Sequence, residues 1–223
     1  MPPAMPQTLH ACPSLSALLC RALARHPEAD AFVWDGGRAS YRATAEVIGR
    51  MQAVLAAAGL QRGDRVALLA SNRMDGWCAS MAVMASGMVS SALHPLGSTD
   101  DQAFQIDDVG ARALVVDPRA FGDRAAALMA RCAGLELVFT LGSAEFGQDL
   151  VAAAEQIGHH SLRDLSRPGD LAVVNYTGGT TGRSKGVMRS QAGYAAMTRD
   201  VALDFELPER PYYLAAAPMT HAA

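Results

Sequence analysis

NYTGGTTGRSKGV, residues 175–187, is the stretch on which the interpretation of the whole chain depends. It overlaps Leu171 to Tyr176 (LAVVNY), a short apolar run rich in β-branched residues that predicts a strand buried on both faces. Beyond Tyr176 the bulky side chains nearly disappear. Glycines let backbone N–H groups approach a ligand closely, and threonines add hydroxyl donors. These residues are Thr177, Gly178, Gly179, Thr180, Thr181 and Gly182. The composition predicts a loop that holds an oxyanion.

A single ammonium group lies in this loop. The chain contains eighteen Arg and one Lys, and that Lys is Lys185. A Lys side chain can pass between loop backbone and phosphate oxygens, whereas Arg is planar and bulkier. We also expect the periodic segment that begins near Ser190 to place a helix N-terminus, with its positive dipole end, behind the loop.

Two familiar phosphate-binding motifs do not fit this stretch. A Walker A loop requires G-x-x-x-x-G-K followed by Ser or Thr, but Arg183 and Ser184 separate Gly182 from Lys185. The dinucleotide fingerprint G-x-G-x-x-G would need its first glycine where Thr177 stands. The non-functional alternative is an exposed turn of small residues. We disfavour it, because about ten consecutive positions would have to imitate a phosphate cradle by chance.

YTGGTTGRSKG closely resembles the phosphate loop of the adenylate-forming superfamily, which includes acyl-CoA synthetases, luciferases and peptide-synthetase adenylation domains. The usual pattern of that loop is Tyr/Phe-Thr-Ser-Gly-Ser/Thr-Thr-Gly-x-Pro-Lys-Gly. Gly178 stands here in place of the Ser, and Ser184 stands in place of the Pro. Both departures predict a loop that is more flexible than the family norm.

The resemblance implies that the protein activates a carboxylic acid with ATP. A carboxylate is a poor electrophile, and joining it to the α-phosphorus of ATP gives an acyl adenylate and releases pyrophosphate. Negative charge builds on phosphate oxygens in this step, so backbone N–H groups, hydroxyls, an ammonium and Mg²⁺ stabilise it. In acyl-CoA synthetases the thiol of CoA, the co-substrate, then attacks the adenylate.

The same resemblance implies roles for single residues. Thr177 would contact Mg²⁺ and phosphate, and Thr180 and Thr181 would hold the β- and γ-phosphates. Lys185 would be the catalytic residue that offsets the charge on the leaving group. The nucleotide-binding set would be completed by the glycines of the loop, which are Gly178, Gly179, Gly182 and Gly186.

A candidate for the substrate side lies near the end of the chain. The segment from Pro218 to His221 (PMTH) resembles a family segment, Pro-Met/Leu-x-His, whose His or aromatic residue lines the carboxylate pocket. His221 is therefore the expected substrate-binding residue. The alternative, an exposed His near a frayed end, stays open.

Strand and helix patterns alternate along the chain before the loop. The expected strands are Arg65–Ala70, Met88–Leu93, Ala113–Val116 and Leu135–Leu141, and the expected helices are Asp75–Ser86, Thr99–Val109 and Phe121–Cys132. This spacing predicts an α/β fold with a mostly parallel sheet flanked by helices. After the loop we expect a helix over Gln191–Phe205 and a strand over Tyr212–Ala217.

The first sixty residues are predicted to form packing elements without a part in the chemistry. Residues 1–13 predict a loose arm, and a short helix from Ser14 is expected to end at Pro27. A small hairpin is expected over residues 31–41 around Asp35-Gly36-Gly37, followed by a helix over Tyr41–Ala58 that Ser40 would cap.

Domain organisation follows from the resemblance. Family members continue with a Tyr-x-x-Thr-Glu element that supplies the Mg²⁺-binding Glu, an Asp for the ribose hydroxyls, a hinge, and a small carboxy-terminal domain with the adenylation Lys. Here 37 residues follow Gly186. We interpret residues 1–223 as an incomplete amino-terminal AMP-binding domain without the carboxy-terminal domain, and we expect it to be inactive alone. Its expected parts are a first α/β portion (1–157), a connecting loop (158–170) and the phosphate-loop portion (171–223).

Composition excludes several function classes. The net charge of −3, without a basic patch, argues against nucleic-acid binding. No stretch of the sequence is predicted to span a membrane. We make no prediction that His159-His160 binds a metal. Four Cys without metal spacing predict reduced thiols and a cytoplasmic protein. We expect small-molecule partners, a carboxylic acid and CoA, and leave a homodimer open.

Three hypotheses survive at this stage. The first is part of an acyl-CoA synthetase for a fatty or other organic acid, favoured by His94-Pro95-Leu96 and by the residues that follow the loop (VMRS). The second is amino-acid or aryl-acid adenylation in the same superfamily. The third is a non-catalytic nucleotide-binding or dimerising module.

Overall fold

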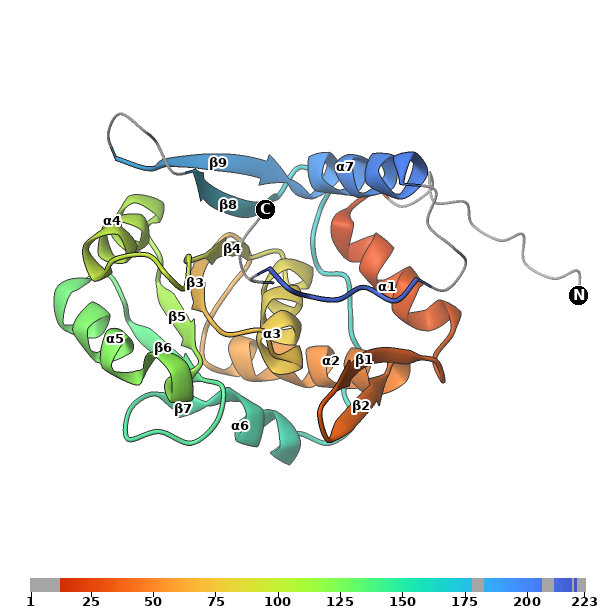
Figure 1. Ribbon diagram of the computed structural model, residues 1–223, viewed down its shortest axis with the longest axis horizontal. Helices are drawn as coiled ribbons and strands as arrows, with labels where there is room; N and C mark the ends of the chain where they lie inside the picture. The colour runs from red at the N-terminus through yellow and green to blue at the C-terminus, as the bar shows by residue number, and fades with distance from the viewer. Residues whose placement is uncertain (1–12, 178–182, 206–210, 218, 220–223) are drawn as a thin grey trace, which may run out of the picture.

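The computed structural model describes residues 13–177, 183–205, 211–217 and 219. Its centre is a seven-stranded sheet in the order β7-β6-β5-β3-β4-β8-β9 (Figure 1). Strand β9 runs antiparallel to β8, and all the other pairs are parallel. The strands are β3 (Arg65–Leu69), β4 (Val89–Ala92), β5 (Ala113–Val116), β6 (Leu137–Thr140), β7 (Gln148–Asp149), β8 (Leu171–Thr177) and β9 (Lys185–Ser190). The α/β fold with a mostly parallel sheet is therefore confirmed.

Helices cover both faces of the sheet. They are α1 (Leu15–Arg25), α2 (Tyr41–Ala57), α3 (Met74–Ala85), α4 (Thr99–Val109), α5 (Pro118–Arg131), α6 (Leu150–Gln156) and α7 (Gln191–Asp204). The small hairpin that the sequence predicted is present as β1 (Asp30–Trp34) with β2 (Gly37–Ser40), and it lies outside the main sheet. None of the described helices is both long and apolar enough to cross a bilayer.

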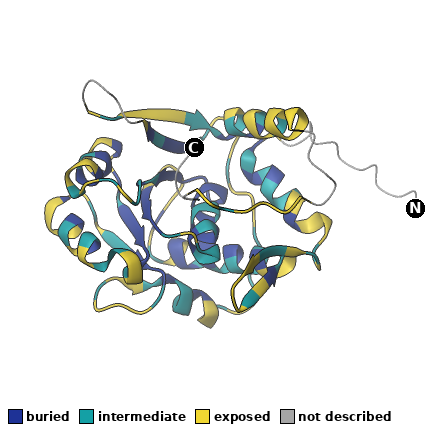
Figure 2. Ribbon diagram, in the orientation of Figure 1, coloured by how far each residue is buried: buried dark blue, intermediate teal, exposed yellow. Residues whose placement is uncertain are grey.

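Two apolar cores form because side chains alternate across each strand. In β3, Val66 and Leu68 pack against α1, α2, α3 and α6, whereas Ala67 and Leu69 pack against α4 and α5. Figure 2 shows the consequence, buried strands between helices that expose their outer sides. A sheet covered on both faces explains why these strands are short continuous apolar runs.

Capping residues set where the helices begin. The side chain of Ser40 accepts a hydrogen bond from the N–H of Ala43 and starts α2, as expected. Helix α5 begins at Pro118, earlier than predicted, because Asp117 caps it and a proline suits the first helical position. Phe121 has non-helical angles (φ −135°, ψ 22°), so regular helix resumes close to the predicted start.

Two expectations after the phosphate loop are wrong. Strand β9 returns along β8, pairing Thr177 with Lys185 and Leu171 with Ser190. Helix α7 therefore begins beside the start of β8. The six residues of β9 separate this helix from the loop by about 20 Å, so its N-terminus does not lie behind the loop. Residues 212–217 form no strand, and Tyr212 and Tyr213 are 90% and 87% exposed.

The strand order places a crossover point in the middle of the sheet. From β3 the chain passes to β4 on one side and then returns to β5 on the other. In parallel sheets ligands bind outside the carboxyl ends of the strands, where the connections diverge. The segments after β3, β4, β5 and β8 all leave the sheet at this edge.

Candidate functional site

The segment predicted to hold phosphate joins β8 to β9. Thr177 lies opposite Lys185 in this antiparallel pair, and Tyr176 lies opposite Gly186. Side chains of directly opposed residues project from the same face, and successive residues alternate. Thr177 and Lys185 therefore share one face of the hairpin. The remaining predicted loop residues, Gly178, Gly179, Thr180, Thr181 and Gly182, lie outside the described residues.

Thr177 and Lys185 are both exposed. The hydroxyl of Thr177 donates to the carbonyl of Lys185 at 3.5 Å, which is long for an O–H···O hydrogen bond. The bond constrains the hydroxyl weakly and leaves it able to turn to an incoming oxyanion. The two side chains assigned the most direct chemistry are thus brought together at the mouth of the hairpin.

Gly186 has a packing role that the sequence did not reveal. A Cβ added at this position would lie 2.9 Å from Cγ1 of Val174 and 3.4 Å from Cζ of Tyr176. The tyrosine ring covers the backbone of its partner residue on the face opposite Thr177. Packing of the hairpin therefore requires a residue without a side chain here, even without a nucleotide.

A cavity of about 130 Å³ borders the Thr177 face. Asn175 lines it, and since Asn175 and Thr177 are two residues apart on one strand, their side chains share that face. Its walls come from β3, β4, β8, α3 and α7 and include Trp77, Met81, Ser90 and Tyr194, and Met219 closes it from outside these elements. Asn175 is a candidate that sequence reasoning did not assign to the site, although its two-residue spacing from Thr177 could have indicated it.

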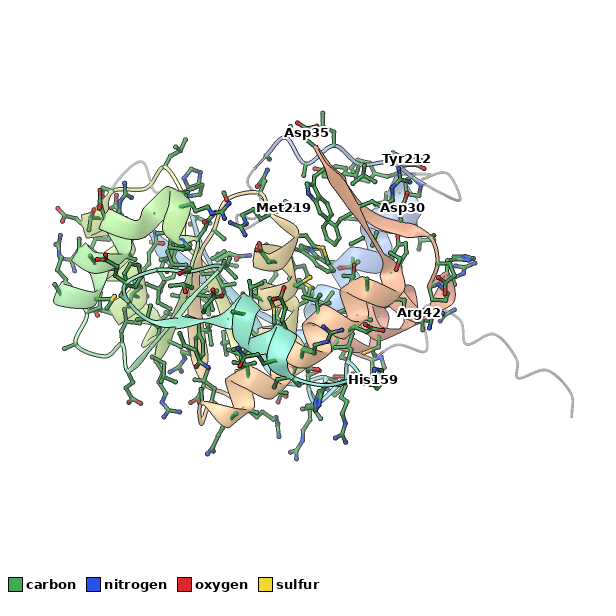
Figure 3. The ribbon with its side chains drawn as sticks, turned by 90° about the horizontal axis from the view of Figure 1, so that it is seen from below. Asp30, Asp35, Arg42, His159, Tyr212 and Met219 are labelled. Carbon is green, nitrogen blue, oxygen red and sulfur yellow. The ribbon has the colours of Figure 1, made fainter. Side chains whose placement is uncertain are left out.

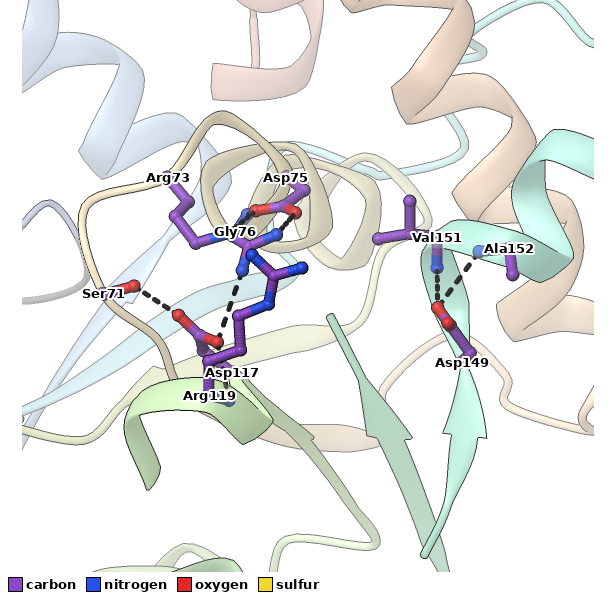
Figure 4. Close-up of polar contacts among 9 residues, drawn as sticks. All are labelled: Ser71, Arg73, Asp75, Gly76, Asp117, Arg119, Asp149, Val151 and Ala152. Atoms are coloured by element: carbon purple, nitrogen blue, oxygen red, sulfur yellow. Dashed lines mark hydrogen bonds and ion pairs between the residues drawn. The ribbon is translucent and has the colours of Figure 1, made fainter. Parts of the chain in front are cut away.

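A polar cluster fixes the connection after β3. Asp117, 2% exposed at the end of β5, accepts a hydrogen bond from the hydroxyl of Ser71 and pairs with Arg73 at 3.4 Å (Figure 4). Arg73 also pairs with Asp75 at the start of α3. Because each charge in this cluster has a partner, we assign it a structural role, that of joining the segments that leave β3 and β5.

Asn72, in the same connection, holds a distant segment. Its Nδ2 donates to the carbonyls of Ala215 at 2.8 Å and Ala217 at 2.9 Å, and its Oδ1 accepts from the N–H of Met219 at 2.8 Å. Figure 3 labels Tyr212 and Met219 in this part of the chain. His221, the predicted substrate residue, lies outside the described residues, and Asn72 holds Ala215, Ala217 and Met219 before it.

The paired histidines lie elsewhere. His159 is exposed, shares a hydrogen bond with Ser161 at 3.3 Å, and lies apart from Met219 in Figure 3. Within the described ranges no group of three or more His, Cys, Asp or Glu residues could hold a metal. An ion at the hairpin would therefore depend on a hydroxyl such as that of Thr177 and on oxygens of the substrate.

The chain is similar to AMP-binding enzymes and to CoA ligases. A model described as AMP-binding enzyme matches residues 19–223. The chain is 32% identical over 212 residues to a medium/long-chain-fatty-acid–CoA ligase of Mycobacterium tuberculosis, covering 92% of this chain and 37% of that protein. It is 30% identical over 167 residues to a 2-succinylbenzoate–CoA ligase of Geobacillus kaustophilus, covering 75% of this chain and 31% of that one.

A solved structure is similar over almost the whole chain. The ATP-bound MatB of Rhodopseudomonas palustris superimposes with a TM-score of 0.79 at 29% identity, covering 94% of this chain and 41% of that one. Across these three proteins, the chain spans between 31% and 41% of the relative's length.

Proposed function

The chain belongs to the AMP-binding enzyme family, and we propose from this premise that a complete protein containing it is an AMP-forming acid–thiol ligase. It would join a carboxylic acid to ATP, release pyrophosphate, and pass the acyl group to CoA. The observation that carries the proposal is the β8–β9 hairpin, where Thr177 and the only Lys of the sequence share one face beside the Gly/Thr-rich loop.

The residues of this hairpin would act by binding and orienting charge. Lys185 would place its ammonium against phosphate oxygens while pyrophosphate departs, and the hydroxyl of Thr177 would hold the phosphate chain in register. The glycines and threonines of residues 178–182, with Gly186, would complete the nucleotide-binding set. A hydroxyl is a suitable neutral oxygen ligand for Mg²⁺, and the ion, when bound, would neutralise charge on the phosphates.

The acid would bind on the face that Thr177 and Asn175 share. Met219 lines the cavity on that face, and His221 follows two residues later, so we assign His221 to the carboxylate end of the acid. The apolar walls formed by Trp77 and Met81 suit an organic acid with an apolar body, such as a fatty acid. We further propose a cytoplasmic location, because the described cysteines, Cys20, Cys78 and Cys132, are free thiols.

The test is pyrophosphate release by the complete gene product. With ATP and Mg²⁺, addition of medium- or long-chain fatty acids should start release, and CoA should then be consumed in equal amount. Release that depends on amino acids or aryl acids without CoA consumption would replace the proposal with a peptide-synthetase type of adenylation. Tight ATP binding without release for any acid would favour a non-catalytic nucleotide-binding module.

A further inference from the structure

Helix α4 contacts both ends of the segment that joins β8 to β9. Three of its residues, Phe104, Gln105 and Asp108, reach this segment from the face opposite Thr177 and Lys185. Phe104 and Asp108 are four residues apart and are therefore neighbours on one side of the helix. Figure 1 shows α4 beneath the start of β9.

The entry to the loop is fixed at Tyr176. Its hydroxyl donates to Oδ2 of Asp108 at 2.6 Å, and its ring meets Phe104 edge to face with 6.5 Å between centroids. Tyr176 is 6% exposed, and burial, reinforced by the hydrogen bond to Asp108, raises the pKa of its hydroxyl. The proton therefore stays on Tyr176 and donates to a carboxylate, which is a strong kind of hydrogen bond.

The exit from the loop contacts α4 at two successive residues. The guanidinium of Arg183 lies over the ring of Phe104, with 5.1 Å from Cζ to the centroid. The amide Nε2 of Gln105 donates to the hydroxyl of Ser184 at 3.4 Å, which is long for an N–H···O hydrogen bond. Lys185 follows immediately, so both contacts lie next to the point where its backbone enters β9.

Packing alone does not explain a glutamine at position 105. It is 8% exposed, and its Oε1 is buried without a hydrogen-bond partner among the described residues. A buried oxygen without a partner costs stability, so an apolar side chain of similar size would suit the fold better. The hydrogen bond to Ser184 is a role for the amide of Gln105 that an apolar side chain could not fill.

Ser184 occupies the position where the family pattern has proline. A proline would fix φ and remove an N–H, and so would stiffen the chain just before the lysine. Serine does neither, but it supplies a hydroxyl that Gln105 can hold. We propose that Gln105 is a positioning residue that restrains Ser184, replaces the missing proline, and thereby orients Lys185 toward ATP.

This inference rests on the proposed function for its catalytic consequence, but the restraint itself is independent of catalysis. The test uses the complete protein with Gln105→Leu, Ser184→Ala, Ser184→Pro, and the double variant Gln105→Leu/Ser184→Pro. Asp100→Asn, an exposed change in the first turn of α4, is the matched control.

We expect Gln105→Leu and Ser184→Ala to raise the KM for ATP by about 2–10-fold, as loss of one hydrogen bond would, with an unchanged or raised Tm for Gln105→Leu. Ser184→Pro should keep the normal KM, and Gln105→Leu should then have no effect on it. Equal effects of Gln105→Leu in both backgrounds would overturn the proposal, because Gln105 would not act through Ser184.

Amide hydrogen exchange measured without nucleotide tests the restraint of Ser184 separately from the proposed function. Exchange over residues 183–187 should accelerate in Gln105→Leu and in Ser184→Ala, and it should match the unaltered protein in Asp100→Asn. Faster exchange in a protein that never consumes ATP would retain the restraint and reject the proposed function. Unchanged exchange in both variants would reject the restraint whatever the activity.

Discussion

Lys185 provides the most direct prediction at the scale of single residues. Its ammonium lies on the same face as the hydroxyl of Thr177, where phosphate charge would develop. We expect Lys185→Ala to slow acyl-adenylate formation by roughly 10–1000-fold, the scale of losing one oriented donor. Pyrophosphate release in the complete protein measures this rate.

A matched control for charge is Arg131→Ala. Arg131 pairs with Asp100 at 2.6 Å on the outside of α5, and exposed pairs of this kind contribute little. Removing this cation should leave the rate within about twofold, as expected for an exposed pair. If Lys185→Ala behaved like Arg131→Ala, the lysine would have no part in the chemistry.

Asn72 gives a second prediction at this scale. Asn72→Ala removes three hydrogen bonds to Ala215, Ala217 and Met219, so the chain before His221 loses its attachment. We expect the KM for the acid to rise about tenfold while the KM for ATP stays constant, since each bond contributes about 1 kcal/mol and such effects are not additive.

Ser71→Ala is the control for Asn72. The hydroxyl of Ser71 binds Asp117, on the side of this connection that faces β5, so its loss should lower Tm without changing the KM for the acid. A rise in the KM for ATP as large as that for the acid in Asn72→Ala would contradict a role confined to the acid side.

Sequence reasoning assigned to the candidate site residues that are adjacent in sequence, and it did not assign Asn72 and Gln105, which are distant from them. Thr177 and Lys185 belong to one recognisable run. Asn72 acts on carbonyls more than 140 positions away, and Gln105 acts on Ser184 79 positions away. Such contacts depend on how the strands are ordered, and no local pattern carries that information.

At the scale of elements, the β8–β9 hairpin predicts a steric effect. A methyl group added at Gly186 would place its carbon 2.9 Å from Cγ1 of Val174, which is buried against α4. We expect Gly186→Ala to lower the free energy of unfolding by about 1–3 kcal/mol, as overpacking does. Urea denaturation of the complete protein measures the change.

Val174→Ala tests the cause of this effect, because it removes the atom that the added methyl group would meet. In the double variant Gly186→Ala/Val174→Ala, the loss should be at least about 1 kcal/mol smaller than the sum of the two single losses. Strict additivity would mean that the contact with Val174 does not cause the loss.

Most elements were predictable because a buried parallel sheet gives short apolar runs between periodic helices. Strand β9 was missed because its sequence, KGVMRS, contains a glycine and shows no alternation, and four of its six residues are exposed. The strand predicted over residues 212–217 is absent although the run is apolar. A strand needs a partner, and in the described chain this segment pairs with no other strand.

At the scale of the whole molecule, buried thiols give stability a dependence on pH. Cys132 is 1% exposed, and burial, aided by the charge of Asp107, raises the pKa of its thiol from 9.0 to about 11. The unfolded chain then releases this proton at lower pH than the folded one. The contribution is constant below pH 9 and is lost as pH rises from about 9 to 11.

The loss from this one thiol should reach about 3 kcal/mol, because each pKa unit corresponds to about 1.4 kcal/mol. Cys132→Ala should reduce the decline in unfolding free energy between pH 9 and 11. The control is Leu214→Ala, which removes an 85% exposed side chain without an ionisable group and should leave the decline unchanged. An identical pH profile for Cys132→Ala and the unaltered protein would show that this thiol ionises freely in the folded state.

The exposure of the hairpin predicts that residues 1–223 alone form no acyl adenylate. Thr177 and Lys185 are open to water, where two unit charges 4 Å apart interact by only about 1 kcal/mol, compared with about 4 kcal/mol near a partly screened protein surface. Further chain would have to exclude water before the ammonium could stabilise a departing pyrophosphate. We expect the isolated 223-residue chain to show no acid-dependent pyrophosphate release and the complete protein to show it under the same conditions. Release by the pure 223-residue chain would mean that the hairpin stabilises the transition state without being enclosed.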